Sequence, residues 1–207
     1  MPHAVIYIHG FNSSPLSLKA QQLQQYFVEH QLLEKAEYEL HVPELDHQPE
    51  VAIAQLQSLI ERYDGQPVLV IGSSLGGYYS LWLAANFEKV CAVLINPAVY
   101  PYRLLADLLG ENQNLYTGQR YILDETHIEQ LKAVDVKQLP SPSSVLLLSQ
   151  MGDETLDYRE AVDKYPSIEQ RVSEGGDHGY VNFEQEIAGI FTFYEQHLQR
   201  LKLQNNH

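Results

Sequence analysis

The sequence predicts an α/β fold in which about six mainly parallel strands form one sheet with helices on both faces. Short apolar runs alternate with helical patterns along most of the chain, which is typical of βαβ units. The runs "VIYI", "VLVI" and "VLLL" are continuous rather than alternating, as expected of strands buried on both faces. With 207 residues, 44% hydrophobic and 19% charged, the chain suits a single globular domain spanning 1–207.

The elements follow in order along the chain. Apolar runs predict strands at residues 4–9, 38–42, 68–71, 91–95, 145–149 and 169–172. Helical spacing predicts helices at 18–31, 51–63, 75–86, around 158–165 and at 183–203. In the last of these helices, apolar residues recur every three or four positions from Phe183 to Leu198, so one face of that helix is expected to pack on the sheet.

The interval 97–143 departs from this alternation. It contains several tyrosines and a helical stretch near 127–134, but no further apolar run of strand type. Loops of such length are usually functional or carry structure of their own. Two interpretations stay open: a small cap over a pocket, or an ordinary helix with long flanking loops.

Charge and composition restrict the partners and the compartment. The 27 acidic and 13 basic residues give a formal charge of −14, which disfavours nucleic acid and anionic membrane surfaces. The N-terminal residues lack a basic segment followed by a long apolar one, and no run approaches the ~18 apolar residues of a membrane span. We therefore expect a soluble cytoplasmic protein. The single cysteine, Cys91, lies in the apolar run "VCAVLI" and is expected to be a buried strand thiol.

A candidate nucleophile lies where the third strand meets a helix. The stretch "GSSLG" at residues 72–76 fits the pattern G-x-S-x-G with Ser74 at its centre. Glycines two residues to either side allow the sharp turn that exposes such a serine. Ser73 would have Ile71 and Leu75 at the same positions, which are too bulky. Ser74 is therefore the predicted nucleophile, and Ser73 is expected to pack or hydrogen-bond near the strand end.

A serine needs a base, and the base needs an orienting acid. On a parallel sheet of this kind, the acid and then the histidine follow the serine in the chain. His178, in the glycine-rich loop "EGGDHGYV" between the last strand and the last helix, fits that order. The other eight histidines either precede Ser74 or lie in the irregular interval, on the last helix or at the end of the chain: His3, His9, His30, His41, His47, His127, His197 and His207.

The orienting acid is expected after the strand that precedes the histidine loop. Asp153 follows the strand 145–149 directly and is the predicted acid. Glu154 and Asp157 are close alternatives, and Asp157 also suits the position that caps the next helix. Asp177 is adjacent to His178 in sequence and is expected to be a solvated loop residue.

Acyl transfer also needs donors for an oxyanion. The backbone N–H of Leu75, directly after the nucleophile, and that of Phe11, in the loop "HGFNSSP" after the first strand, are the predicted donors. A second group, His41, Asp46 and His47, follows the second strand. No further histidine pair at ligand spacing accompanies it, so a metal site is disfavoured, and pocket lining and an exposed loop remain open.

Four segments together carry a resemblance to a known family: "YIHGFNSSPLSLKAQ", "IGSSLGGYYS", "GDETLDYREA" and "GGDHGYVNFE". They resemble the small bacterial YqiA-type esterases of the α/β-hydrolase superfamily. The resemblance implies an α/β-hydrolase-like three-layer sandwich and a carboxylesterase or thioesterase that acts on a small-molecule acyl ester or acyl-CoA, without a metal or an organic cofactor. It also implies Ser74, Asp153 and His178 as the triad, with Phe11 and Leu75 at the oxyanion hole.

Two alternatives remain at this level. An acyl-CoA thioesterase would use the same triad; the acidic chain argues mildly against a polyphosphate substrate, although Arg103 and Arg120 could offset this locally. A non-catalytic binding protein on the same fold is the second alternative. The presence of all three triad candidates disfavours it.

Overall fold

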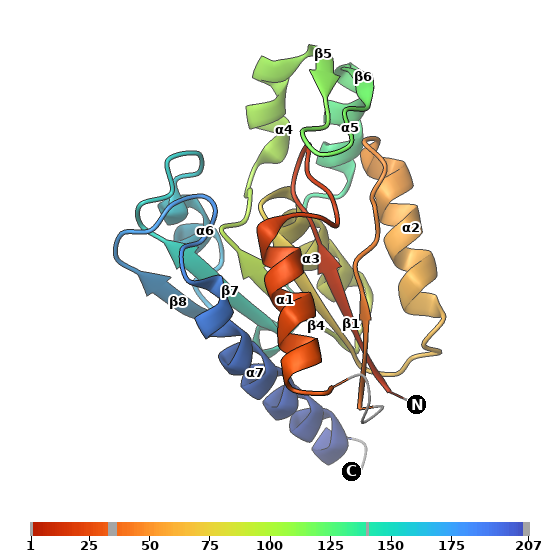
Figure 1. Cartoon of the computed structure of the whole chain (residues 1–207), viewed down its shortest axis with the longest axis vertical. Helices are drawn as coiled ribbons and strands as arrows, with labels where there is room; N and C mark the ends of the chain where they lie inside the picture. The colour runs from red at the N-terminus through yellow and green to blue at the C-terminus, as the bar shows by residue number, and fades with distance from the viewer. Residues whose placement is uncertain (1, 33–36, 140, 205–207) are drawn as a thin grey trace.

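The computed structural model describes residues 2–32, 37–139 and 141–204, and its centre is a six-stranded sheet (Figure 1). The strand order is β2-β1-β3-β4-β7-β8, and every pairing within this sheet is parallel. Its strands are β1 (His3–Ile8), β2 (Tyr38–His41), β3 (Val68–Ser73), β4 (Val90–Ile95), β7 (Val145–Gln150) and β8 (Glu169–Ser173). The predicted number and direction of the strands are therefore confirmed.

Helices cover both faces of the sheet (Figure 1). One face packs against α1 (Leu18–Glu29) and α7 (Phe183–Gln204), whose inward side chains include Phe27 and Ile190. The other face packs against α2 (Pro49–Glu61), α3 (Leu75–Asn86) and α6 (Tyr158–Lys164). Burial on both faces explains why β1, β3, β4 and β7 are nearly continuously apolar, whereas the outer strands β2 and β8 are more polar and partly exposed.

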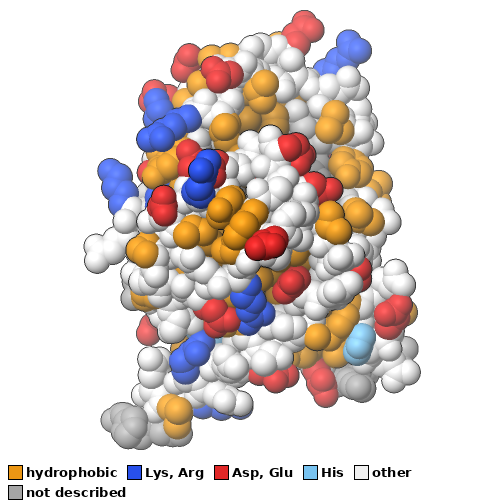
Figure 2. All heavy atoms as spheres, turned by 90° about the vertical axis from the view of Figure 1, so that its left-hand side faces the viewer, with side chains coloured by type: hydrophobic (Ala, Val, Ile, Leu, Met, Phe, Trp, Pro, Cys, Tyr) orange, Lys and Arg blue, Asp and Glu red, His pale blue; other side chains and the backbone are white. Residues whose placement is uncertain are grey.

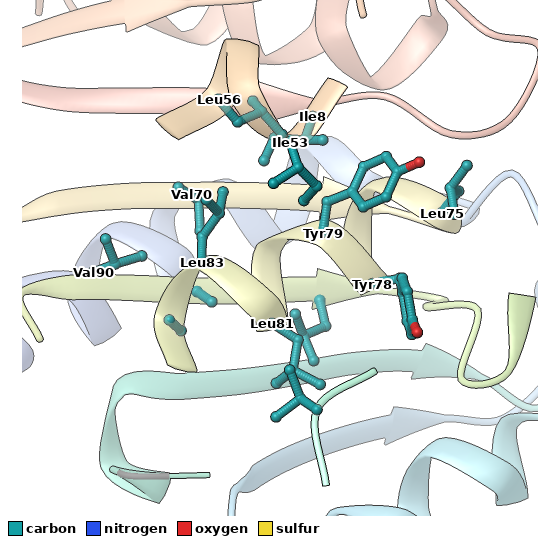
Figure 3. Close-up of a cluster of buried hydrophobic side chains, with 14 of the residues drawn as sticks. Ile8, Ile53, Leu56, Val70, Leu75, Tyr78, Tyr79, Leu81, Leu83 and Val90 are labelled. Carbon is teal, nitrogen blue, oxygen red and sulfur yellow. The ribbon is translucent and has the colours of Figure 1, made fainter. Parts of the chain in front are cut away.

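The core consists of two clusters, one on each side of the sheet. Figure 3 shows part of the cluster on the α2 and α3 side, where Ile53 and Leu56 of α2 lie near Val70 of β3 and Leu83 of α3. All six residues of β3 and all six of β4 are buried. Cys91 of β4 is completely buried among them, in the place expected from the sequence. The strand that leads to the candidate nucleophile is thus held rigidly on both faces.

The interval between β4 and β7 contains more structure than a helix with loops. It comprises α4 (Pro101–Leu104), a short 3₁₀ helix (Leu105–Leu108), the strands β5 (Gly110–Gln113) and β6 (Arg120–Leu123), α5 (Glu125–Ala133) and a second 3₁₀ helix (Pro142–Ser144). The two strands pair antiparallel as a separate hairpin. Figure 1 shows α4, β5, β6 and α5 together at the top of the molecule. Residue 140 of the predicted 97–143 segment lies outside the described residues.

The hairpin and α5 are bound to the sheet domain by specific hydrogen bonds. Tyr121 of β6 donates its hydroxyl hydrogen to Oδ1 of Asn12 at 2.7 Å, and Asn12 lies in the loop after β1. Asn114 donates to the carbonyl oxygen of Ser13 at 2.7 Å. On the other side, the hydroxyl of Tyr78 in α3 donates to the carbonyl oxygen of Leu131 in α5 at 2.8 Å. The segment is therefore fixed beside the loop that carries the predicted oxyanion donor.

Element boundaries differ from the predicted ones by a few residues. The strand β3 continues to Ser73 instead of residue 71, because Gly72 and Ser73 still pair with β4. The helix α5 begins at Glu125 instead of near 127, because the Asp124 side chain accepts hydrogen bonds from the first-turn N–H groups.

Charges of both signs are interspersed on the side of the molecule that Figure 2 shows. On the side of the molecule in Figure 2, acidic, basic and hydrophobic side chains alternate, and no broad basic area covers this side. That distribution agrees with the formal charge of −14 in disfavouring a phosphate backbone as partner. Over the part of the chain that the structure describes, no helix combines the length and the apolar character needed to cross a membrane.

Candidate active site

Ser74 lies at the sharp turn between β3 and α3. Its backbone has φ 55° and ψ −117°, a conformation that L-residues rarely adopt and that the surrounding structure must hold in place. The backbone N–H of Ser74 donates to the carbonyl oxygen of Ile95 at 3.0 Å, which fixes the turn to β4. A strained serine between a strand and a helix is the geometry predicted for the nucleophile.

The two flanking glycines are required by close contacts. A Cβ atom on Gly72 would lie 2.1 Å from the carbonyl oxygen of Gly76. A Cβ atom on Gly76 would lie 2.0 Å from the carbonyl oxygen of Ile8 in β1. Real Cβ atoms do not approach backbone atoms so closely. Gly76 is therefore required by the packing of this turn against β1, and Gly72 by its closeness to the first turns of α3.

The neighbouring serine has a different environment. Ser73 is the last residue of β3, pairs with Ile95 and is only 5% exposed. Ser74 is half-buried, so it is the more accessible of the two. This arrangement agrees with the sequence argument that separates Ser74 from Ser73.

His178 and Asp153 are brought into direct contact. His178 Nδ1 lies 2.9 Å from Oδ2 and 3.0 Å from Oδ1 of Asp153. The Asp153 side chain is 2% exposed and that of His178 is 26% exposed. A carboxylate accepts hydrogen bonds, so Nδ1 of His178 carries a hydrogen and donates a hydrogen bond to Asp153. In a neutral ring, the other nitrogen, Nε2, is then a hydrogen-bond acceptor.

The environment of Asp153 favours its charged form. Its Oδ1 atom also accepts hydrogen bonds from the backbone N–H groups of Thr155 and Leu156, at 2.9 and 2.8 Å. Burial alone would raise the pKa of Asp153, but the hydrogen bond from His178 and these two N–H donors outweigh burial and lower the pKa below its usual value. A negative charge is thus available next to the histidine ring.

The alternative acids occupy other positions. Asp157 caps α6 by accepting from the N–H of Arg159, and it forms an ion pair with the same guanidinium at 2.7 Å. Glu154 accepts from the backbone N–H of His178 at 3.0 Å, so it contacts the loop rather than the ring. Among these three residues only Asp153 is bonded to the imidazole of His178.

The loop after β1 passes directly over Ser74. A Cβ atom on Gly10 would lie 3.2 Å from Cβ and 3.7 Å from Oγ of Ser74. Phe11, the next residue, and Leu75 both line a small cavity of about 40 Å³. Leu75 is the first residue of α3, where backbone N–H groups have no acceptor within the helix. Both residues predicted as oxyanion donors therefore line one cavity, close to Ser74.

Three residues that hold the histidine loop were not predicted. Asn96, directly after β4, has φ 38°, and its side chain donates to the carbonyl oxygen of Asp177 at 2.9 Å. Gln150, at the end of β7, accepts from the N–H of Val181 at 2.8 Å. Lys19 of α1 donates to the carbonyl oxygen of Gly179 at 2.8 Å. Asn96 and Gln150 could have been found from the sequence, because each is a polar residue at the end of a strongly apolar strand. Lys19 has no such signal.

The group His41, Asp46 and His47 separates in the structure. His41 bonds to the hydroxyl of Tyr63 and lies 3.5 Å from Glu39. Asp46 accepts from the N–H of Gln48, and His47 lies against His127. Within the described residues, no three histidine, cysteine or acidic side chains gather in a way that could hold a metal ion. Asp46 and His47 do line the cavity beside Phe11, so of the two interpretations left open, pocket lining is the one the structure supports.

Solved structures with the same fold include Est1E from Butyrivibrio proteoclasticus, with a TM-score of 0.70 and 15% identity over 97% of this chain and 89% of that one. Mouse alpha/beta hydrolase domain-containing protein 10 matches with a TM-score of 0.67 and 19% identity, covering 96% and 90% of the two chains. A monoacylglycerol lipase from Paleococcus ferrophilus matches with a TM-score of 0.64 and 16% identity, covering 94% and 96%. At these identities the likeness shows the fold, and the predicted α/β-hydrolase architecture is confirmed.

The sequence model of the family described as "Uncharacterised protein family (UPF0227)" matches residues 4–195. This match includes each strand of the main sheet except the first residue of β1, and it includes all the predicted site residues. It therefore extends over nearly all of the described fold.

Proposed function

The chain belongs to the UPF0227 family, and from the geometry of its site we propose that it is a serine hydrolase that cleaves carboxylic esters of acyl substrates. The proposal rests on one combination above all: a strained serine on a strand-to-helix turn, together with a histidine bound to a buried carboxylate. The fold neighbour named as a monoacylglycerol lipase supports the same class of reaction.

In the proposed mechanism, Ser74 Oγ attacks the acyl carbonyl carbon while His178 Nε2 accepts the hydroxyl proton. The carbonyl oxygen becomes an oxyanion, which the backbone N–H groups of Phe11 and Leu75 stabilise. His178 then donates its proton to the leaving oxygen, and an acyl-enzyme remains on Ser74.

Water hydrolyses this acyl-enzyme in the second half of the reaction. His178 accepts a proton from the attacking water and returns it to Ser74 Oγ, which releases the carboxylic acid. Asp153 stays ionised throughout, holds Nδ1–H of the ring and stabilises the imidazolium that forms in each half. None of these steps requires a metal ion or an organic cofactor.

The segment 97–143 acts as a small cap in this proposal. Asn114, Gln119 and Tyr121 from the hairpin region line the same cavity as Phe11 and Leu75. The cap would therefore shape the pocket for the acyl group, while the sheet domain supplies the reacting groups. Loops and insertions of this kind commonly determine specificity on a rigid scaffold.

An acyl-CoA thioesterase is the second candidate, because a thiol can leave in place of an alcohol with the same residues. Arg120 of β6 lies in the surface hollow next to Tyr121 and could approach a phosphate group near the cap. A panel of p-nitrophenyl esters and acyl-CoA thioesters, matched in acyl chain, separates the two candidates by their kcat/KM values.

A fluorophosphonate probe tests whether the protein is a serine hydrolase at all. We expect a covalent adduct on the peptide that contains Ser74, detected by mass spectrometry, and loss of ester hydrolysis in proportion to labelling. No adduct, together with no hydrolysis of any ester or thioester, would favour a non-catalytic binding protein on this fold.

A further inference from the structure

Three side chains form a hydrogen-bonded chain from the cap to the cavity. Asp124 Oδ1 lies 2.7 Å from His127 Nδ1, and His127 Nε2 lies 3.0 Å from His47 Nδ1. His127 is 4% exposed on α5, whereas His47 belongs to the loop after β2. The ring of Tyr121 stacks on His47, with 4.3 Å between ring centroids and an interplanar angle of 17°. The position of the His47 ring is therefore fixed from two sides.

This chain also determines which nitrogen of His47 carries a proton. The Asp124 carboxylate accepts, so the proton of the 2.7 Å contact belongs to His127 Nδ1, although the backbone N–H of Asp124 also lies 3.2 Å from this nitrogen. The shorter contact to a charged oxygen is the stronger of the two. In a neutral His127, Nε2 is then an acceptor, and His47 Nδ1 must donate to it. With its single proton on Nδ1, a neutral His47 has a free lone pair on Nε2.

The neutral form of His47 is favoured by its surroundings. Burial lowers the pKa of His47, and this effect exceeds the opposing attraction of Asp46. No described residue forms a hydrogen bond with His47 Nε2. His9, the other histidine of the cavity, differs, because its Nδ1 binds the carbonyl oxygen of Gly10 and its Nε2 accepts from the N–H of Leu45. His47 is thus the histidine of this cavity that retains a free acceptor.

The cavity adjoins Ser74 through its chain neighbour Leu75 and through Gly10, and the proposed function assigns it to the acyl part of the substrate. It is lined by Phe11 and Leu75, the proposed oxyanion residues, and also by His47 and Tyr79. Its volume of about 40 Å³ leaves room for only a short group. A hydroxyl group of the substrate that enters the cavity can donate a hydrogen bond to Nε2 of His47. The hydrocarbon part of the same substrate then lies against the aromatic and aliphatic side chains of the cavity.

We propose that His47 is a specificity-determining residue, and that the preferred substrates are esters of short hydroxylated acyl groups whose hydroxyl donates a hydrogen bond to His47 Nε2. This inference rests on the proposed serine hydrolase function and names its substrate class. A site that binds a hydroxyl discriminates against the analogue without it, because the acceptor then loses its water without gaining a partner.

The test compares two esters of nearly equal shape, ethyl 3-hydroxypropanoate and ethyl butanoate, in a pH-stat at about pH 8, where histidine rings ordinarily carry one proton. We expect wild type to prefer the hydroxylated ester by at least about tenfold in kcat/KM. His47→Phe keeps a ring that can stack on Tyr121 but cannot accept, and it should reduce this preference to about one to threefold. The preference is calculated within each protein, from its own kcat/KM values for the two esters.

Two further variants make the assignment specific. His41→Phe changes a histidine at the end of β2 that contacts Tyr63 instead of the cavity, and it should leave the preference unchanged. His127 lies behind His47 and acts on the substrate only by positioning that ring. His127→Phe removes the acceptor for His47 Nδ1, so it should weaken the preference for the hydroxylated ester. Thermal midpoints of the variants show whether the fold is intact.

The outcomes separate this inference from the function on which it rests. A wild-type preference near one, or a preference that persists in His47→Phe, overturns the role of His47 while ester hydrolysis itself stands. If wild type hydrolyses neither ester and also forms no adduct with the fluorophosphonate probe, the proposed function is overturned, and the substrate class with it. If wild type forms the adduct but hydrolyses neither ester, only the substrate class is overturned.

Discussion

The imidazole of His178 is bound to the carboxylate of Asp153 by contacts of 2.9 and 3.0 Å between residues 25 positions apart in the chain. Each residue lies in the loop that follows one of two neighbouring parallel strands, Asp153 after β7 and His178 after β8. The two loops also meet through their backbones, because the N–H of Gly152 donates to the carbonyl oxygen of Gly175 at 2.7 Å. The contact between acid and base is thus a direct result of strand pairing.

Replacing Asp153 by Asn should lower kcat by orders of magnitude, on the scale of ~10⁴ for a triad of this kind. The amide can donate to His178 Nδ1, which stabilises the wrong tautomer. Asp157→Asn is the matched control, because Asp157 caps α6 and pairs with Arg159. Its kcat should remain within a few fold of wild type. The reverse order of the two effects in an esterase assay would remove Asp153 from the triad.

Ser74→Ala should abolish probe labelling and hydrolysis while the thermal midpoint changes little, because the side chain is small and half-buried. Ser73→Ala should retain labelling and most of the rate, because Ser73 is buried in β3. Mass spectrometry of the labelled wild-type peptide decides between the two positions. An adduct on Ser73 would contradict the assignment.

Gly10→Ala should separate activity from stability. The new Cβ would lie 3.2 Å from Ser74 Cβ, so a shift of a few tenths of an ångström relieves the contact but displaces the nucleophile and the neighbouring N–H of Phe11. We expect kcat/KM to fall on the order of ten- to a hundredfold with a nearly unchanged thermal midpoint.

Gly76→Ala is the contrasting variant, since its Cβ would lie 2.0 Å from the backbone of Ile8. This variant should lose stability by about 1–3 kcal/mol or more, visible in urea unfolding. Equal thermal midpoints for Gly10→Ala and Gly76→Ala would show that the turn is not held against β1 as described.

Lys19 should make the free energy of unfolding depend on pH. Burial lowers the pKa of Lys19 to about 8, although attraction to Asp177 and Asp153 opposes this. In the unfolded chain a lysine titrates near 10.4, so between about pH 8 and about pH 10 the unfolded state binds more protons. The free energy of unfolding therefore gains a contribution that rises with pH in this window. Below it the cost of the buried ammonium is present in full.

Lys19→Met removes this titration and provides the comparison. The difference in free energy of unfolding, wild type minus variant, should become more positive from about pH 7 to about pH 10, as measured by urea unfolding at each pH. A difference that stays constant or decreases over this range would mean that Lys19 is not desolvated in the folded protein.

Much of the fold followed from apolar patterning, because β1, β3, β4 and β7 are nearly continuous apolar runs, whereas the outer strands β2 and β8 are more polar. The hairpin of β5 and β6 was not predicted. Its strands contain polar residues such as Glu111 and Gln113, and their partly exposed surfaces give no apolar run. Their pairing depends instead on contacts with the β1 loop, from Tyr121 to Asn12 and from Asn114 to Ser13, which join residues about a hundred positions apart.

The candidate site was predictable to the extent that chain order and turn chemistry determine it. Ser74, Asp153 and His178 each follow a strand of one parallel sheet, so the same edge holds all three. The bond between His47 and His127 could not be predicted, since it joins residues 80 positions apart through the placement of α5. The contact of Lys19 with the histidine loop could not be predicted either, because a lysine on an amphipathic helix is ordinarily solvated.

The position of the reacting groups along the chain bears on when activity can appear during synthesis. Ser74 and both proposed oxyanion donors belong to the first half of the chain, whereas Asp153 and His178 follow its last two strands. A nascent chain that has completed β3 and α3 can form the serine turn, but no base reaches it until β7 has paired with β4 and β8 with β7. A ribosome-bound intermediate would therefore be silent toward esters. Reactivity with an active-site probe would report chains in which β8 has paired and the loop that carries His178 has folded.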